Sequence, residues 1–236
     1  NKNVRVDLPI IGDVAYVLED MLRVWKARAP QLDKAAHKAW WKEIDGWRAS
    51  KSLAYKKQKD VIMPQHAIER LFALTRDKDV YITTEVGQHQ MWAAQFFHFD
   101  EPNRWMTSGG LGTMGYGFPA VLGAQAAFPN RTVIDIAGDG SIQMNIQELA
   151  TAVQYHLPVK IMILNNGYLG MVRQWQSLFY KKRYSHTHLT TSPDFVKLAE
   201  AYGAAGLRVS RIEEVEPAIL KALAIDGPVI VDFEVE

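Results

Sequence analysis

Two short polar motifs, Gly138-Asp139-Gly140 and Asn165-Asn166, each follow an apolar run typical of a buried strand. The 24 residues between them can hold a loop and a helix, and a right-handed crossover of that kind makes the two strands parallel and adjacent. Adjacent strands lie about 4.8 Å apart, so the side chains of Asp139 and Asn166 can converge. A carboxylate and an amide oxygen suit Mg²⁺, which usually takes one or two carboxylates and fills its remaining positions with phosphate oxygens and water.

The residues around Asp139 favour a diphosphate beside the metal. Gly138 and Gly140 let the backbone approach phosphate groups. Ser141 is expected to begin a helix whose free N–H groups and positive dipole end attract an anion. Either motif alone is more often only a turn. Their occurrence after consecutive strands of one βαβ unit favours a metal and diphosphate site over two unrelated turns.

A second glycine pattern suggests a different ligand. Gly110, Gly112 and Gly115 fit the dinucleotide fingerprint G-x-G-x-x-G, and Asp135 lies 20 residues further on. However, the preceding stretch 100–108 is a poor strand, and Asp135 falls inside the next expected strand rather than at its end. Nicotinamide binding is therefore the weaker interpretation.

The order of expected elements predicts an α/β fold with a doubly wound, mostly parallel sheet and helices on both faces. The expected strands are near-continuous apolar runs, as in a sheet covered on both sides. Ligands of such sheets bind beyond the carboxyl ends of the strands, where both polar motifs would lie. The expected strands are 4–11, 80–83, 132–137, 159–164, 206–209 and 228–233, and the expected helices are 13–27, 65–75, 88–97, one ending at 127, 142–155, 170–179, 193–203 and 212–224.

Composition narrows the function classes. The formal net charge of +1 gives no reason to expect nucleic acid or an anionic membrane as a partner. The absence of cysteine excludes disulfides and thiolate metal sites, and a reducing compartment is consistent with it. No apolar run reaches the ~18 residues of a membrane span. The chain begins with Asn, and we expect it to be a segment of a longer polypeptide.

Four stretches of the sequence carry a family resemblance: VGQHQMWAAQ from residue 86, SGGLGTMGYGFPAVLGAQ from 108, ILNNGYLGMVRQWQSLFY from 163 and RYSHTH from 183. They resemble the catalytic subunit of acetohydroxyacid synthase (acetolactate synthase), a thiamine diphosphate enzyme. The resemblance extends over essentially the whole chain. It implies that residues 1–28 are the end of a central domain and that 61–236 form the C-terminal domain that binds diphosphate and magnesium. Residues 29–60, with three tryptophans, are expected to form a helical linker with one covered face.

The resemblance also implies roles for individual residues. Asp139, the side chain of Asn166 and the carbonyl oxygen of Tyr168 would bind Mg²⁺. The family often has an acidic residue at the Tyr168 position, but only the backbone is used there. Met114 would be the apolar wedge that bends the cofactor. The full set of implied cofactor contacts is Val86, Gly87, Gln88, His89, Gly112, Met114, Gly138, Asp139, Gly140, Ser141, Asn166, Gly170 and Met171.

Met171, Val172 and Trp175 lie on one helical turn, and their spacing alone would make them core residues. The resemblance instead implies a wall that accepts the second 2-ketoacid, where herbicides bind in relatives. Residues 181–188 are either a solvated loop or a lid that orders when the cofactor binds.

The implied reaction joins two pyruvates, or pyruvate and 2-ketobutyrate, with loss of CO₂, in branched-chain amino acid biosynthesis. It implies FAD bound mainly by the central domain, a homodimer or tetramer, an optional small regulatory subunit, and a cytoplasmic or organellar location. The activating glutamate is expected in an N-terminal domain outside this segment. Glu85 is not assigned that role, so no certain catalytic residue lies here and the isolated segment is expected to be inactive.

Two other functions remain open on the sequence. One is a different thiamine diphosphate carboligase or oxidase, such as a glyoxylate carboligase or a pyruvate oxidase. Met171 and Trp175 together favour the synthase over these. The other is a non-catalytic module that binds cofactor or a partner subunit, which the tryptophan-rich linker would suit.

Overall fold

The computed structural model describes residues 3–29, 31 and 33–236. Residues 1, 2, 30 and 32, which fall within the predicted divisions 1–28 and 29–60, lie outside the described residues. The chain forms two compact units, Asn1–Ala54 and Tyr55–Glu236. Among the described residues, no helix is both long and apolar enough to cross a lipid bilayer.

The described residues of the first unit form two helices, α1 (Val14–Arg28) and α2 (Lys34–Ala49). Each begins after an aspartate that caps it: Asp13 accepts the N–H of Ala15 at 2.9 Å, and Asp33 accepts two N–H groups at 3.0 Å. The strand predicted at 4–11 is wrong, because these residues form no ladder in the structure. An isolated extended segment without a pairing partner is not stable as a strand.

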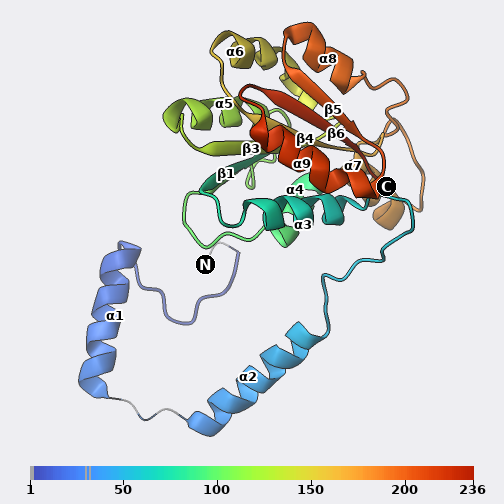
Figure 1. Ribbon diagram of the computed structural model, residues 1–236. Coiled ribbons are helices and arrows are strands. Elements are labelled where there is room, and N and C mark those ends of the chain that lie inside the picture. Colours follow the sequence, from blue (N-terminus) through green and yellow to red (C-terminus); the bar gives the residue numbers. More distant parts are fainter. Residues whose placement is uncertain (1–2, 30, 32) are drawn as a thin grey trace. The chain divides into compact units, whose positions relative to one another are not determined.

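The second unit is built on a parallel sheet, and this confirms the predicted fold class (Figure 1). In the part of the chain that the structure describes, the six strands are arranged in the order β2-β1-β3-β4-β6-β5, and all pairings are parallel. Their bounds are β1 (Val80–Thr84), β2 (Trp105–Thr107), β3 (Thr132–Gly138), β4 (Lys160–Asn165), β5 (Ala205–Val209) and β6 (Val229–Glu234).

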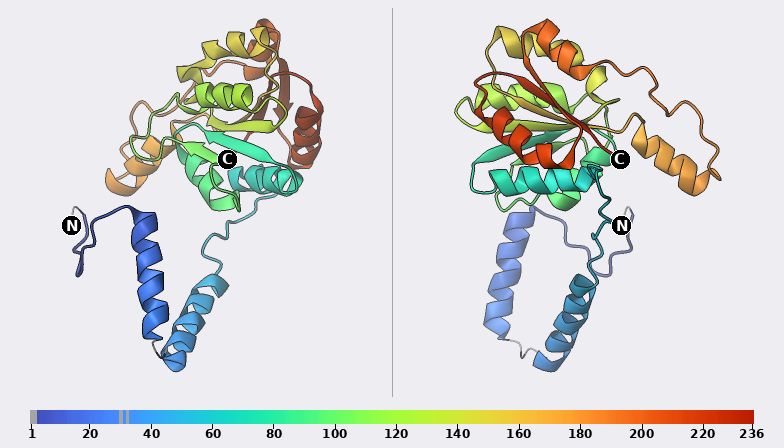
Figure 2. Two further views of the ribbon diagram at one scale, coloured as in Figure 1. Left: turned by 90° about the vertical axis from the view of Figure 1, so that its left-hand side faces the viewer. Right: turned by 45° about the vertical axis from the view of Figure 1, so that its right-hand side comes forward.

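Helices cover both faces of the sheet (Figures 1 and 2). One face packs against α3 (Pro64–Thr75), α4 (Gln88–Phe96) and α9 (Val215–Ala224), and the other against α5 (Gly117–Ala127), α6 (Leu149–Gln154) and α8 (Phe195–Tyr202). Strand β3 shows the division clearly, since Ile134 and Ile136 enter the first core and Val133 and Ala137 the second. Strands buried on both sides explain the continuous apolar runs in the sequence.

Most helices begin and end within about two residues of their predicted bounds, as is usual for helix ends. The single helix predicted at 142–155 is wrong. The chain instead forms two short 3-10 turns, Ile142–Met144 and Ile146–Glu148, before α6. Asn145 separates them, and its side-chain amide donates to the carbonyl of Gly115 at 2.6 Å. This tertiary bond interrupts the helix at Asn145.

Two further elements lie at the periphery of the second unit. β2, which the sequence suggested only as a poor strand, is a short edge strand paired with β1. Helix α7 (Gly170–Phe179) follows β4, and every residue in it is at least partly exposed. Figure 2 shows this helix projecting from the body of the unit. Its outer face carries the exposed side chains of Trp175, Leu178 and Phe179.

Candidate functional site

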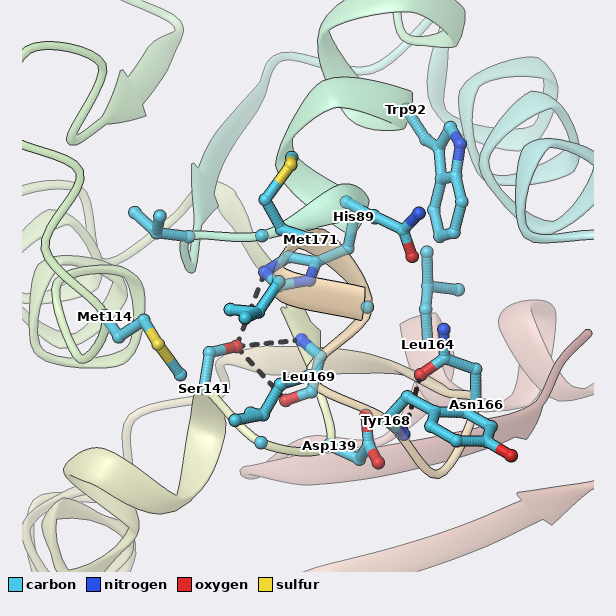
Figure 3. Close-up of a pocket in the computed structure, with 17 residues that line it drawn as sticks. His89, Trp92, Met114, Asp139, Ser141, Leu164, Asn166, Tyr168, Leu169 and Met171 are labelled. Carbon is cyan, nitrogen blue, oxygen red and sulfur yellow. Dashed lines mark hydrogen bonds between the residues drawn. The ribbon is translucent and has the colours of Figure 1, made fainter. Parts of the chain in front are cut away.

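A pocket lies at the carboxyl edge of the sheet, where the loops after β1, β3 and β4 meet (Figure 3). Gly138 pairs with Leu164, so the motifs that follow β3 and β4 lie next to each other as predicted. The pocket brings together most of the residues proposed from the sequence: Val86, Gly87, Gln88, His89, Met114, Gly138, Asp139, Gly140, Ser141, Asn166, Tyr168, Gly170, Met171 and Val172.

Asp139 supplies a carboxylate at the floor of this pocket. Its side chain is buried, and its Oδ2 has no hydrogen-bond partner among the described residues. Burial raises the pKa of Asp139 to about 6, although the backbone N–H groups of Gly167 and Gly140 partly offset this effect. An unpaired buried carboxylate oxygen is costly by itself. A bound cation would supply the missing partner.

Asn166 lies beside Asp139 at the start of a tight turn. Its Oδ1 accepts the N–H of Tyr168 at 3.1 Å, and an amide oxygen keeps a second lone pair for a metal. Two backbone hydrogen bonds of 2.8 Å, from Leu169 to Thr187 and from Leu189 to Gly167, tie this turn to the segment that follows α7. The turn is therefore held on both sides in the structure.

The ring of Tyr168 packs against His188 and Arg173. It stacks on His188, with ring centroids 4.7 Å apart, and the guanidinium of Arg173 lies 4.2 Å from its centroid. No group of three or more His, Cys, Asp or Glu residues suited to a metal occurs among the described residues. A metal here would therefore need the amide of Asn166, a backbone carbonyl and ligand oxygens besides Asp139.

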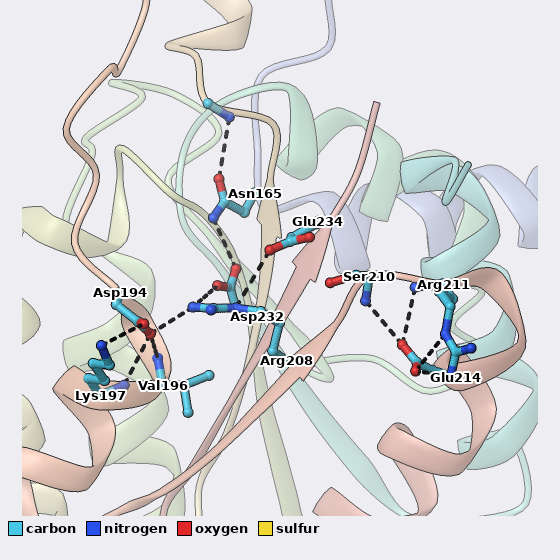
Figure 4. A network of polar contacts seen from close by, with 11 residues as sticks. Asn165, Asp194, Val196, Lys197, Arg208, Ser210, Arg211, Glu214, Asp232 and Glu234 are labelled. Atoms are coloured by element: carbon cyan, nitrogen blue, oxygen red, sulfur yellow. Dashed lines mark hydrogen bonds and ion pairs between the residues drawn. The ribbon is translucent and has the colours of Figure 1, made fainter. Parts of the chain in front are cut away.

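Asn165, the first residue of the pair, has a different role from Asn166 (Figure 4). Its Nδ2 donates to Asp232 at 3.1 Å, and its Oδ1 accepts the N–H of Gly167 at 3.3 Å. Asp232 is buried in β6 and lies 3.6 Å from Arg208, which also bonds Asp194 at 2.6 Å. Burial raises the pKa of Asp232, while Asn165 and Arg208 lower it. Asn165 thus connects the turn at Gly167 to Asp232 in β6.

His89 is enclosed by glycines. A Cβ at Gly87 would lie 2.7 Å from the imidazole, and one at Gly138 would lie 2.6 Å from it. Its Nε2 is 3.4 Å from the hydroxyl of Ser141, which also donates to the carbonyl of Gly138. Burial lowers the pKa of His89 to about 4, so the ring is neutral near pH 7. A hydrogen bond with the backbone of Glu85 acts against the effect of burial. A neutral imidazole has one N–H donor, and this bond engages it.

Ser141 does not begin an α-helix, which corrects the sequence-based expectation. It precedes a 3-10 turn of three residues, so the dipole available to an anion is that of one turn only. Gly140 allows a close approach of Leu169, since a Cβ at Gly140 would lie 2.6 Å from it. Gly138 and Gly140 thus let His89 and Leu169 pack directly against the backbone between β3 and this turn.

The structure adds residues that the sequence did not single out, and leaves two of the proposed ones outside. Trp92, Leu164 and Leu169 also line the pocket. Gln174 accepts a hydrogen bond of 2.8 Å from Gln88 and thereby links α7 to α4. The α-helical spacing of Gln88 and Trp92 is the signal that could have identified Trp92. Gly112 and Trp175 do not line the pocket, and Trp175 is exposed on α7.

These features fit a diphosphate held through a divalent cation. The unpaired oxygen of Asp139 and the free lone pair of Asn166 provide hard ligands. Glycines 87, 138, 140 and 170 let the side chains that line the pocket pack directly against the backbone, because a Cβ at any of them would collide with His89, Leu169 or Gln88. Met114, Leu169 and Met171 give the rest of the pocket an apolar lining. The nicotinamide interpretation is not supported by the position of Asp135, which is buried inside β3 and bonded to Thr83.

Comparisons with known proteins agree with this geometry. The chain is 49% identical over 223 residues to "Acetolactate synthase isozyme 3 large subunit" of Escherichia coli (strain K12), covering 94% of this chain and 39% of that protein. It is 48% identical over 241 residues to "Acetolactate synthase large subunit" of Buchnera aphidicola subsp. Schizaphis graminum (strain Sg), covering 100% of this chain and 41% of that protein. It is 47% identical to "Acetolactate synthase" of Mycobacterium bovis over 98% of this chain and 38% of that protein.

The chain thus spans about two-fifths of the length of these relatives. Residues 85–233, which contain the whole pocket, match the family described as "Thiamine pyrophosphate enzyme, C-terminal TPP binding domain". The sheet edge, its paired polar motifs and this match lead to one conclusion: the chain belongs to the thiamine pyrophosphate enzymes and contains their C-terminal cofactor-binding domain.

Proposed function

We propose that this chain is the C-terminal part of an acetolactate synthase that condenses two pyruvates, or pyruvate and 2-ketobutyrate, with loss of CO₂. The observation that carries the proposal is the pairing of Asp139, whose buried oxygen has no partner among the described residues, with Asn166 at the ends of adjacent strands. The acetolactate synthase names of relatives 46–49% identical to the chain support the choice of reaction.

Each side of the pocket has a separate task in this proposal. Asp139, Asn166 and the carbonyl of Tyr168 would hold Mg²⁺, while Gln88, His89 and the backbone of Gly140 and Ser141 would face the diphosphate. When bound, thiamine diphosphate supplies the nucleophilic carbon and the electron sink that loss of CO₂ requires.

The chain's own residues orient that cofactor and keep water from it. Met114 would press against the middle of the cofactor, and the neutral His89 would lie on the diphosphate side of the pocket without adding charge. Met171, Val172 and Trp175 would form the wall that accepts the second 2-ketoacid. Trp175 is exposed in this chain, so in the proposal a further part of the enzyme covers it. The activating glutamate also comes from outside this segment.

The proposal extends to the whole enzyme. It includes FAD held mainly by a central domain that residues 1–28 complete, with residues 29–60 as the linker to the domain 61–236. It also includes a homodimer or tetramer, a small regulatory subunit as an optional partner, and a cytoplasmic or organellar location. The isolated segment, which lacks the activating glutamate, should form no acetolactate.

The test is product analysis with the full-length protein, Mg²⁺, thiamine diphosphate, FAD and pyruvate. Acetolactate is the expected product, whereas acetyl phosphate formed with phosphate and oxygen would indicate a pyruvate oxidase. Asp139→Ala should abolish both activity and Mg²⁺-dependent cofactor binding. Asp77→Ala, at an exposed carboxylate remote from the pocket, is the matched control. Normal acetolactate formation by Asp139→Ala would refute the proposed site, and cofactor binding without any turnover would favour a non-catalytic module.

A further inference from the structure

A buried carboxyl pair, Glu85 and Asp135, lies beneath the glycine-rich segment 108–117. Glu85 directly follows β1, and Asp135 lies inside β3. Both side chains are fully buried, and neither lines the cofactor pocket. Asp135 accepts a hydrogen bond of 2.8 Å from Thr83, with which it is also in register. Two buried acids in one place call for an explanation, because burying charge is costly.

Glu85 uses both of its oxygens on the same short stretch of backbone. One accepts the N–H of Gly115 at 2.6 Å and the other the N–H of Phe118 at 2.9 Å. These two residues flank the start of α5, whose own N-cap, Tyr116, makes no side-chain capping bond. Glu85 therefore caps α5 from another element and places negative charge at the positive end of the helix.

Gly115 is held from the opposite side as well. Its carbonyl accepts the amide of Asn145 at 2.6 Å, and its φ of 94° is a conformation that favours glycine. A Cβ at Gly115 would lie 2.7 Å from the Asn145 amide, so the contact is close. The peptide groups of Gly115 are thus fixed by Glu85 at the N–H and by Asn145 at the C=O.

Met114, the residue before Gly115, lines the cofactor pocket (Figure 3). We propose that Glu85 and Asn145 are positioning residues that fix the main chain of Gly115 and so hold Met114 against the bound cofactor. This inference rests on the proposed function. It also gives a role to Asn145, which lies between two 3-10 turns where a single helix was predicted at 142–155.

The charges of the pair agree with this role. Burial raises the pKa of Asp135 well above its ordinary value, and the nearby Glu85 raises it further. Burial also raises the pKa of Glu85, but several backbone N–H groups lower it. The N–H groups of Gly115 and Phe118 thus favour the charged form of Glu85, whereas the nearby carboxyl of Glu85 disfavours the charged form of Asp135.

The test compares cofactor affinity and amide exchange in variants of the full-length protein. In Glu85→Gln an amide N–H₂ replaces one acceptor oxygen and faces a backbone donor. We expect the dissociation constant of thiamine diphosphate with Mg²⁺ to rise about tenfold, a change of about 1.4 kcal/mol. We also expect hydrogen exchange at the amides of Gly115 and Phe118 to accelerate by at least as much. Asp135→Asn is the matched control, because it converts the other buried carboxyl, which bonds Thr83 and not Gly115 or Phe118, to an amide of the same shape. It should change neither value by more than about twofold.

A double-mutant cycle separates positioning from general destabilisation. If Glu85 acts through Met114, then Glu85→Gln should weaken binding less than about twofold in a Met114→Ala background. An equal loss in both backgrounds, or unchanged exchange at Gly115, would overturn the inference. If Glu85→Gln does not fold, Asn145→Ala tests the other bond to Gly115 in the same way. Failure of the wild-type protein to bind thiamine diphosphate would refute the proposed function instead. The exchange measurement would still show whether Glu85 and Asn145 fix the main chain of Gly115.

Discussion

Asp139→Asn tests whether the buried carboxylate after β3 destabilises the metal-free protein when it is ionised, as expected for a group that a cation would neutralise. Burial raises the pKa of Asp139 from its ordinary value of 3.8 to about 6. At 1.36 kcal/mol for each pKa unit, this difference is worth about 3 kcal/mol. The folded protein binds this proton more tightly than the unfolded chain does. The corresponding stability is therefore fully present below about pH 4 and is lost as the pH rises through 6.

Asparagine has nearly the same shape as aspartate but cannot ionise. Its amide would leave a buried polar atom where Oδ2 now has no partner among the described residues, at a cost of about 1–3 kcal/mol at every pH. This constant cost cancels when the variant is compared with the wild type at two pH values. Between pH 5 and pH 8, the remaining difference in the free energy of unfolding is about 1.4 kcal/mol, in favour of the variant at pH 8.

The assay is urea denaturation of the metal-free protein at both pH values, followed by far-ultraviolet circular dichroism. Asp77→Asn, at an exposed side chain, is the control and should show no such pH-dependent difference. Mg²⁺ with thiamine diphosphate at about a hundred times the dissociation constant should add about 2.7 kcal/mol to the wild type and nothing to Asp139→Asn. The same variant effect at pH 5 and pH 8 would refute the claim that ionised Asp139 destabilises the metal-free protein.

Three further predictions concern the surroundings of Asp139. Gly138→Ala would place a Cβ 2.6 Å from the imidazole of His89 and should lower the free energy of unfolding by about 1–3 kcal/mol, seen as a lower urea midpoint with an unchanged slope. A pKa of about 4 for His89 predicts that its imidazole NMR signals do not titrate between pH 8 and 5.5; a midpoint near 6.5 would contradict its burial. Asp232→Ala removes the 3.1 Å bond that orients Asn165 and should weaken Mg²⁺ binding about tenfold in calorimetric titration, whereas Glu234→Ala, at the exposed end of β6, should not.

Sequence patterns were sufficient for the strands of the sheet other than β2, and for the edge at which the two polar motifs meet. Continuous apolar runs identify strands such as β3 and β4 because both of their faces are buried. The motifs that contain Asp139 and Asn166 then follow from the rule that parallel strands end at one edge. The two motifs therefore lie close together because of the sheet topology, and the order of elements along the chain predicts that topology.

The sequence was less informative where tertiary contacts decide local structure. Asn145 interrupts a helical pattern because it bonds Gly115, 30 residues away, and no local signal marks that contact. The hydrogen bonds from Gly115 and Phe118 to Glu85 could not be predicted for the same reason. The apolar residues at 4–11 have the composition of a strand, but strand formation depends on a pairing partner.

The parallel sheet also has a consequence for how the protein folds. Within the described part of the chain, no two paired strands are joined by a tight hairpin: Val80 of β1 pairs with Thr132, and Lys160 of β4 with Val229. Each such pairing must close a long stretch of chain before its contacts compensate for the lost entropy, which makes folding slow. The turns that carry Asp139 and Asn166 take up their mutual positions only after β3 and β4 have joined. The rate of that step should therefore limit how soon a newly synthesised molecule can bind a cation at these turns, if the proposed site is correct.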